Sequence, residues 1–130
     1  MDPISIPVIF EDKNFLIINK PSGLVIHPFD NSDEKTLVDY LKESHPDTFS
    51  IAENTFNLQN GDTIALGGIV HKLDRETSGI MVIAKNEPTF NELKKAFLEH
   101  TTKKVYLALV EGIIEVDSLR INAPLGRNKK

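Results

Sequence analysis

Five charged or titratable side chains lie within six residues of the sequence, between two runs that are almost purely apolar. They are His71, Lys72, Asp74, Arg75 and Glu76, between residues 67–70 and 80–84. A carboxylate at the edge of a protein core is costly unless it is paired with donors or cations. Basic neighbours favour the charged form of Asp74, which makes it a candidate nucleophile or general base.

The residues alone leave a second interpretation of Asp74 open. Its carboxylate could accept hydrogen bonds from the amides of a turn at Thr77, Ser78 and Gly79, with Arg75 remaining a solvated charge. Structural carboxylates outnumber catalytic ones in proteins, so spacing by itself favours this structural role.

A metal site is the other chemistry that His71 and Asp74 could serve. Such sites need three or more ligands, and the other histidines, His27, His45 and His100, stand in no signature spacing. The sequence contains no cysteine, which excludes disulfides, thiolate ligands and thiol catalysis. The glycine pair before the charged cluster lacks the Lys-Ser/Thr of a phosphate loop. We therefore expect neither a metal nor an organic cofactor.

Tyr106 and Lys104 are the candidates in the second half of the chain. Tyr106 lies in the segment "KVYLALV", where Val105 and Leu107 would face the opposite side of a strand. Aromatic residues are common in buried strands, so a core tyrosine is the simpler interpretation. Lys103 and Lys104 could be a solvated strand start or a phosphate contact, and the local sequence leaves both open.

The first half of the chain predicts short strands. Runs of β-branched and aromatic residues predict strands at residues 8–10, 15–19 and 24–26. Pro and Gly in "KPSG" predict a tight turn at residues 20–23. Residues 47–66 have weak periodicity and many polar residues, which indicates a loop with at most one short element.

A helix is predicted over residues 31–46. Asn31, Ser32 or Asp33 can cap it, acidic residues fill its first turn, and Pro46 ends it. Apolar residues recur on one face of this segment, which is typical of a helix that packs on a sheet.

The elements that would position the charged cluster follow it. Residues 80–84 form a continuous apolar run that predicts a strand buried on both faces. Residues 86–100 predict a helix capped by their first residue, an asparagine. Residues 103–112 predict another buried strand that ends at a glycine, and residues 119–130 a last strand and loop. The order predicts an α+β domain with a mixed, largely antiparallel sheet and flanking helices.

Length and composition bound the class of protein. A chain of 130 residues, 40% hydrophobic and 26% charged, is typical of one compact globular domain. No apolar run approaches the ~20 residues that cross a bilayer. The first residues carry no basic segment followed by an apolar one, so a secretory signal is not predicted. A cytoplasmic protein is the expectation.

The charge of the chain is unevenly distributed. The net charge is −4, but residues 1–70 carry four Lys/Arg against eleven Asp/Glu, a balance of −7. Residues 71–130 carry eleven against eight, a balance of +3. The overall charge argues against a strongly electrostatic nucleic-acid binder, whereas the basic residues gather in the half that carries the charged cluster.

Four segments together resemble a known family. They are "EDKNFLIINKPSGLVIHP", "GGIVHKLDRETSGIMVIAKN", "KKVYLALVEG" and "INAPLGR". Their order and spacing resemble the catalytic domain of RNA pseudouridine synthases of the RluA type, with the related RsuA type as second choice. The resemblance covers residues 7–127, and residues 30–65 are its least diagnostic part.

The resemblance implies roles for individual residues. Asp74 falls on the family's catalytic nucleophile, which lets a uridine base detach from its sugar, rotate and rejoin through carbon. Tyr106 falls on the aromatic that packs against the flipped uracil, in keeping with the need of a base-flipping enzyme for a stacking surface. Further substrate or phosphate contacts and loop-shaping residues are also implied. The contacts are Arg75, Lys72 and Lys104, and the loop-shaping residues are His71, Thr77 and Gly79.

The resemblance also implies the class of substrate and the absence of a cofactor. The family modifies uridines in structured RNA, ribosomal or transfer RNA, and requires no metal or organic cofactor. Two departures stand out. Lys72 replaces the motif's usual arginine and lacks its planar fork. A basic motif that normally follows the fourth segment is absent.

The absent motif leads to expectations for the chain itself. Residues 1–130 are expected to form part of a pseudouridine synthase catalytic domain, with an exposed sheet edge that favours self-association or marginal stability. The leading hypothesis is an RNA-modifying isomerase. The alternative is a non-catalytic RNA-binding fragment of the same fold.

Overall fold

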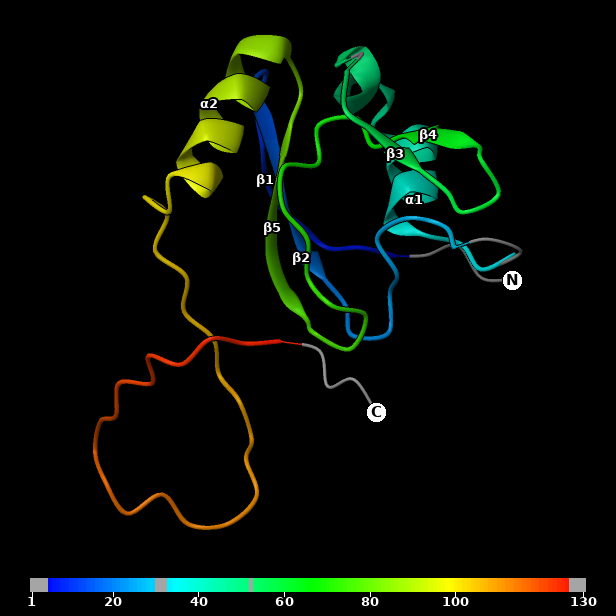
Figure 1. The fold of residues 1–130 in the computed structure, drawn as a ribbon. Coiled ribbons are helices and arrows are strands. Elements are labelled where there is room, and N and C mark those ends of the chain that lie inside the picture. Colours follow the sequence, from blue (N-terminus) through cyan, green and yellow to red (C-terminus); the bar gives the residue numbers. More distant parts are fainter. Residues whose placement is uncertain (1–4, 30–32, 52, 127–130) are drawn as a thin grey trace.

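A computed structural model describes residues 5–29, 33–51 and 53–126 of the protein (Figure 1). The regular structure of these residues comprises two antiparallel sheets and three helices. In chain order the elements are β1 (Val8–Glu11), β2 (Phe15–Lys20), α1 (Leu37–Ser44), the 3-10 helix η1 (Pro46–Ser50), β3 (Thr55–Asn57), β4 (Thr63–Ala65), β5 (Gly79–Ala84) and α2 (Glu87–Leu98). The predicted α+β class with an antiparallel sheet is confirmed.

The central strand of the larger sheet is β2, which pairs with β1 on one side and β5 on the other. Every second residue of β2 faces the core, so Leu16, Ile18 and Lys20 are fully buried. Ile83 and Met81 of β5 pair with Leu16 and Ile18 and are equally buried. In Figure 1 the sheet stands between α2 and α1.

The first helix begins later than the sequence predicts. Its cap is Thr36, whose hydroxyl accepts from the backbone N–H of Asp39, while the Asp39 carboxylate accepts from the Thr36 N–H at 2.9 Å. This reciprocal pair satisfies the free donors of the first turn, so the helix begins there. Asp33 is therefore not the cap, and Asn31 and Ser32 lie outside the described residues.

The strand predicted at residues 24–26 is wrong. These three residues are buried but belong to no strand. The carbonyls of Val25 and Ile26 accept from the backbone N–H groups of Leu37 and Val38 at 2.9 and 3.0 Å. The segment therefore bonds to the start of α1, and hydrophobic patterning alone could not distinguish this from strand pairing.

The second helix follows the prediction. Asn86 caps α2 through its side chain, which accepts from the Thr89 N–H at 3.1 Å. Phe90 on its buried face packs with Ala84 and Ile51 in a small core cluster. Among the described residues, no helix is long and apolar enough to cross a membrane.

Residues 47–66 hold more structure than the loop predicted from sequence. The helix η1 begins at Pro46, and β3 and β4 form a two-stranded hairpin with Phe56 opposite Ile64. Both of these side chains pack against the main core, which explains why a polar segment becomes ordered.

The strand at residues 80–84 is confirmed as β5, but its burial on both faces is not. Met81 and Ile83 face the core, while Ile80 is 56% exposed and Val82 is half-buried on the opposite face. The sheet is therefore open on one side near the charged cluster.

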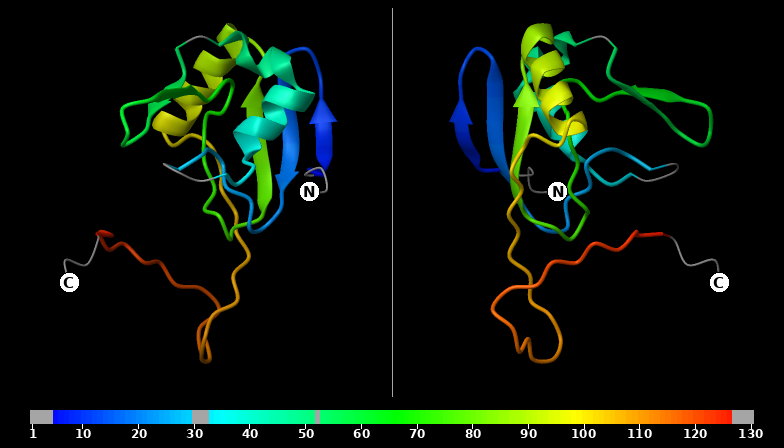
Figure 2. Two further views of the ribbon diagram at one scale, coloured as in Figure 1. Left: turned by 90° about the vertical axis from the view of Figure 1, so that its right-hand side faces the viewer. Right: turned by 60° about the vertical axis from the view of Figure 1, so that its left-hand side comes forward.

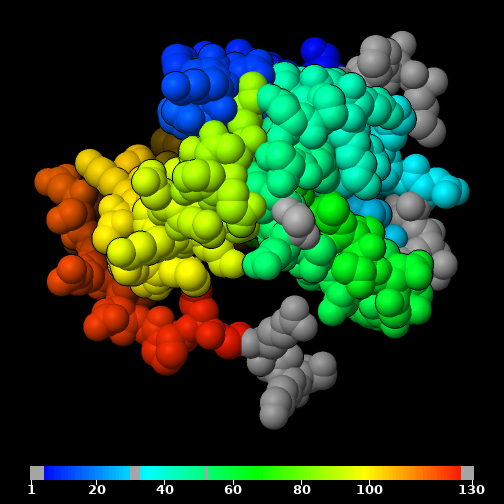
Figure 3. Space-filling view, turned by 90° about the horizontal axis from the view of Figure 1, so that it is seen from above, coloured from blue at the N-terminus to red at the C-terminus, as the bar shows by residue number. Residues whose placement is uncertain are grey.

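Residues 103–126 form no strand, so the strand predicted over residues 103–112 and the described part of the one predicted from residue 119 are wrong. Leu107, Leu109 and Leu125 are fully exposed. A strand requires a neighbour for its backbone N–H and C=O groups, and none of the described residues pairs with this segment. Figure 2 shows the segment leaving α2 as an open loop, and Figure 3 shows it in orange at the periphery. Residues 127–130 lie outside the described residues.

Candidate functional site

The charged cluster lies on the loop that leads into β5. A bridge between Ile69 and Ile83 and a hydrogen bond from the Ala84 N–H to the Gly68 carbonyl at 2.9 Å fix the start of the loop on the sheet. A β-carbon at Gly68 would lie 1.8 Å from the Ala84 carbonyl oxygen, so only glycine fits there. The glycine pair therefore serves close backbone packing.

Gly79 ends the loop and starts β5. Its φ of +135° lies in a region that side-chain-bearing residues rarely adopt. Thr77 is half-buried, and its N–H donates to the Asp74 carbonyl at 3.1 Å to close the turn. Thr77 and Gly79 thus both contribute to the shape of the loop.

His71 ties the loop to the open face of β5. Its Nε2 accepts from the Val82 N–H at 3.0 Å, and its ring stacks on Phe97 of α2 at 4.5 Å and 14°. Burial lowers the pKa of His71, and the nearby Lys104 charge lowers it further. The ring is therefore neutral at pH 7 with its proton on Nδ1, because Nε2 is an acceptor.

Lys20 is a site residue that the sequence did not reveal. It is fully buried, and its ammonium donates to the carbonyls of Pro21, Leu24 and Arg75 at 2.9, 2.9 and 3.0 Å. Burial lowers the pKa of Lys20, and the Glu76 carboxylate opposes this. The available signal was position, because Lys20 continues the inward alternation of Leu16 and Ile18 in β2.

The turn after β2 holds the charged loop at further points. The Gly23 N–H donates to the Arg75 carbonyl at 2.9 Å, and the Ser22 hydroxyl donates to the Glu76 carbonyl at 2.8 Å. Together with Lys20, these contacts attach the backbone of Arg75 and Glu76, next to Asp74, to the turn after β2.

Asp74 itself is exposed at the tip of this loop. Within the described part of the chain, its carboxylate has no hydrogen-bond or ion-pair partner. The Arg75 guanidinium pairs instead with Glu34 at 2.8 Å and with Glu76 at 3.6 Å. The structural interpretation of Asp74, in which turn amides donate to its side chain, is not what the loop shows.

A cavity of about 840 Å³ opens beside the loop, on the open face of β5. Its walls are the loop, Ile80 and Val82 of β5, Phe97 of α2, and residues 102–107. The cavity brings together six of the candidate site residues, which are His71, Lys72, Thr77, Gly79, Lys104 and Tyr106. Asp74 and Arg75 do not line it.

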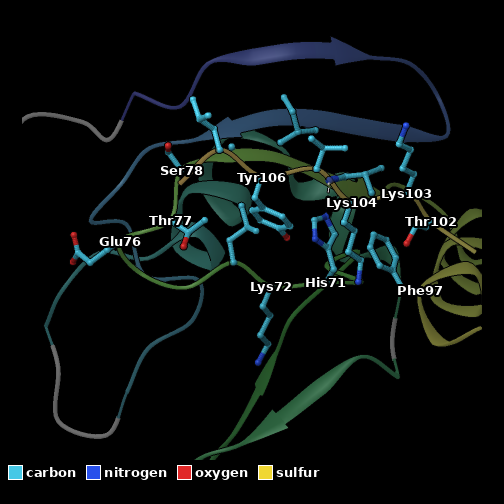
Figure 4. Close-up of a pocket in the computed structure, with 16 residues that line it drawn as sticks. His71, Lys72, Glu76, Thr77, Ser78, Phe97, Thr102, Lys103, Lys104 and Tyr106 are labelled. Atoms are coloured by element: carbon cyan, nitrogen blue, oxygen red, sulfur yellow. Dashed lines mark hydrogen bonds between the residues drawn. The ribbon is translucent and has the colours of Figure 1, made fainter. Parts of the chain in front are cut away.

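The cavity lining combines rings with a cation, since Lys104 lies among Tyr106, His71 and Phe97 (Figure 4). Tyr106 lies between Thr77 and His71 in this view, and its side chain is largely exposed. The Lys104 ammonium lies over the Phe97 ring at 5.3 Å from its centroid. A planar, partly apolar ligand with an attached anion fits such a lining.

Lys72 points away from Tyr106, toward the β3–β4 hairpin (Figure 4). Its ammonium lies 4.6 Å from the centroid of the Phe56 ring. Burial lowers the pKa of Lys72. Among the described residues, no group of three His, Asp or Glu side chains could hold a metal ion.

Comparisons with known proteins agree on one family. The sequence matches the family of RNA pseudouridylate synthases over residues 14–130. It is 35% identical to the uncharacterized RNA pseudouridine synthase YlyB of Bacillus subtilis over 129 residues, 99% of this chain and 39% of that protein. It is 34% identical to ribosomal large subunit pseudouridine synthase D of Neisseria meningitidis serogroup B over 127 residues, 98% of this chain and 30% of that protein.

A solved structure shows the same similarity in three dimensions. Human RNA pseudouridylate synthase domain containing 4 superposes with a TM-score of 0.50 and 25% sequence identity, over 72% of this chain and 30% of that one. The chain thus spans between 30 and 39% of the length of these curated relatives.

Proposed function

The chain belongs to the RNA pseudouridylate synthase family, and we propose that it converts uridine to pseudouridine in RNA, with Asp74 as the catalytic nucleophile. The reaction exchanges the bond between uracil N1 and ribose C1′ for a bond between uracil C5 and C1′. A proton leaves C5 and N1 gains one. The product is an isomer of the substrate, so the reaction balances without a co-reactant.

The observation that carries this proposal is the state of Asp74. Its exposed carboxylate has no partner among the described residues, although Arg75 follows it directly and Lys72 precedes it by two residues. The backbone beside it is fixed by the buried Lys20 and by the turn at Gly23. An available nucleophile on a fixed backbone is what positioned covalent catalysis requires.

The cavity supports the role of a detached base. An enzyme that acts on a base must accept it outside the RNA stack and offer it an aromatic or apolar surface. Tyr106 supplies such a surface beside Thr77, and Lys104 supplies a cation for the adjoining phosphate. Arg75 is engaged by Glu34 and Glu76, so a role in substrate binding requires it to exchange these partners.

The name of one relative supports a proposal for the class of RNA. The Neisseria relative is named for the large ribosomal subunit. We therefore place ribosomal RNA first and transfer RNA second as the substrate.

The direct test measures loss of the C5 proton. RNA of the large ribosomal subunit, transcribed with tritium at uracil C5, is incubated with the wild type and with Asp74→Asn. We expect tritium release by the wild type and background release by Asp74→Asn, because the amide is a far weaker nucleophile. Asp117→Asn, an exposed carboxylate change away from the cavity, is the matched control. Tritium release by a folded Asp74→Asn variant at the wild-type rate would contradict the assignment.

A second candidate is RNA binding without catalysis. Two observations favour it, because Asp74 does not line the cavity and residues 103–107 carry Tyr106 without strand pairing. Wild-type protein that binds the same RNA but releases no tritium would support this candidate over the isomerase.

A further inference from the structure

A row of three rings and one cation connects the charged loop with the β3–β4 hairpin and with the segment that precedes α1. It comprises Phe29, His27, Phe56 and Lys72 and is called here the aromatic row. Successive members lie 5.8, 4.3 and 4.6 Å apart, measured between ring centroids and from the Phe56 centroid to the Lys72 ammonium. We propose that the aromatic row binds an unpaired nucleobase of the substrate RNA that neighbours the target uridine.

The row is fixed at its centre and open at its end. His27 is buried, and its Nδ1–H donates to the Pro28 carbonyl at 3.1 Å, which sets the orientation of the ring. Phe56 on β3 packs against the main core. Phe29 is 61% exposed at the far end, so one large ring surface is presented to solvent on a rigid support. A preformed surface of this kind costs little conformational entropy on binding.

Lys72 makes the row continuous with the cavity. It lines the cavity, its side chain points toward the β3–β4 hairpin (Figure 4), and its ammonium lies 4.6 Å from the centroid of the Phe56 ring. A ligand that fills both the cavity and the row must therefore pass Lys72. An RNA strand has this form, with one base in the cavity, the next on the row, and the linking phosphate beside the ammonium.

Charge identifies the occupant of the row as a base. Lys72 is the single Lys or Arg among the four members of the row, so the row offers a run of phosphates one cation but offers a base three rings. Stacking on an aromatic ring depends on the face of the base and tolerates any sequence. The Lys72 ammonium would then lie where the RNA strand passes from the cavity to the row. The inference rests on the proposed function, since the cavity is taken to hold the target uracil.

The test uses an oligouridylate of roughly 12 nucleotides, a length that one single-strand site covers. It carries a 5′ fluorescein for anisotropy or, in a second probe, 2-aminopurine beside a central uridine. We expect Phe29→Ala to weaken binding roughly tenfold, the size typical of one lost stacking contact, and to abolish quenching of 2-aminopurine. Phe29→Trp should restore both. Phe10→Ala, which removes a similarly exposed ring from the edge strand β1, should change neither.

The outcomes separate this inference from the proposed function. If the wild type quenches 2-aminopurine through Phe29 but releases no tritium from labelled RNA, the row stands and the catalytic assignment fails. If tritium is released and Phe29→Ala binds and quenches as the wild type does, the row is refuted while catalysis stands. Absence of oligouridylate binding by the wild type also refutes the row. Equal loss in Phe29→Ala and Phe10→Ala would assign the effect to general hydrophobicity and refute it too.

Discussion

The two walls of the cavity are held in different ways. The loop wall is attached to the sheet by the buried ammonium of Lys20, by the His71 ring on Val82, and by Gly68 against Ala84. The opposite wall, residues 102–107, has no strand partner among the described residues, and its Lys104 ammonium lies over the Phe97 ring. The loop wall is therefore held by contacts with buried residues. The backbone N–H and C=O groups of residues 102–107 have no strand partner among the described residues.

This difference suits two tasks of the proposed reaction, which are to position Asp74 and to bind the detached base. Under the proposed function, Asp74 is a nucleophile that needs a fixed backbone, and the contacts of the loop wall would supply it. Tyr106 would need only to contact the base, so a segment that becomes ordered when RNA binds would be sufficient for that role. The predictions below test this contrast between a rigid and an open wall.

The largest expected difference is in amide hydrogen exchange. Amides of core strands exchange only when the domain opens, so those of Met81 and Ile83 should be slowed on the order of a thousandfold or more. Amides of residues 105–109 should exchange at nearly the rate of an unstructured peptide, because they lack ladder partners. Peptide-resolved mass spectrometry measures both in one experiment. Comparable protection of the amides in the two segments would contradict the difference between a rigid wall and an open wall.

A matched pair of leucine substitutions tests the same contrast in stability. Leu16 is fully buried in β2, and Leu107 is fully exposed. Leu16→Ala should lower the free energy of unfolding by about 3 kcal/mol through lost burial and a cavity. Leu107→Ala should change it by less than about 0.5 kcal/mol. Urea denaturation followed by circular dichroism measures both, and a large loss in Leu107→Ala would mean that the segment is packed.

Removing the Lys20 ammonium should weaken the loop wall. Lys20→Met keeps the buried stem but leaves three carbonyls without their shared donor, which should cost about 2 kcal/mol. The substitution should also lower the rate of tritium release from RNA under conditions where the variant is fully folded, because Arg75 adjoins Asp74. Lys13→Met, at an exposed turn, is the control and should be neutral. Equal behaviour of the two variants would mean that Lys20 does not hold the loop.

The smallest expected effect is a dependence of stability on pH. The pKa of His71 is lowered in the folded protein, so the unfolded chain binds a proton first as the pH falls. The contribution of His71 is therefore complete above its unfolded pKa of about 6.5 and declines below it, by at most about 1.4 kcal/mol per pH unit. His71→Gln should flatten the decline in urea midpoint, while His100→Gln, an exposed control, should leave it unchanged.

The sequence predicted the elements whose patterns are local. β2, β5 and α2 with its Asn86 cap follow from alternation, an apolar run and capping chemistry. It failed at residues 24–26 and 103–112, where equally apolar residues do not pair. Strand formation depends on a partner elsewhere in the fold, and β-propensity describes only the fit to such a surface.

The sequence named candidate site residues, and the structure brings six of them together. His71, Lys72, Thr77, Gly79, Lys104 and Tyr106 line one cavity, while their roles in binding a substrate stay predictions. The catalytic role of Asp74 stays a prediction. Lys20 and Phe56 were missed because their importance depends on contacts with residues distant in sequence, at Arg75 and Lys72.

Because Lys20 is buried, the rate at which its amine is acylated reports movement of the loop that covers it. Acylating reagents attack neutral, accessible amines, and in the folded protein this one is enclosed by Pro21, Leu24 and Arg75. Most other lysines are exposed and will be labelled first. The delayed labelling of Lys20 would therefore record how often the loop that carries Asp74 lifts from the sheet.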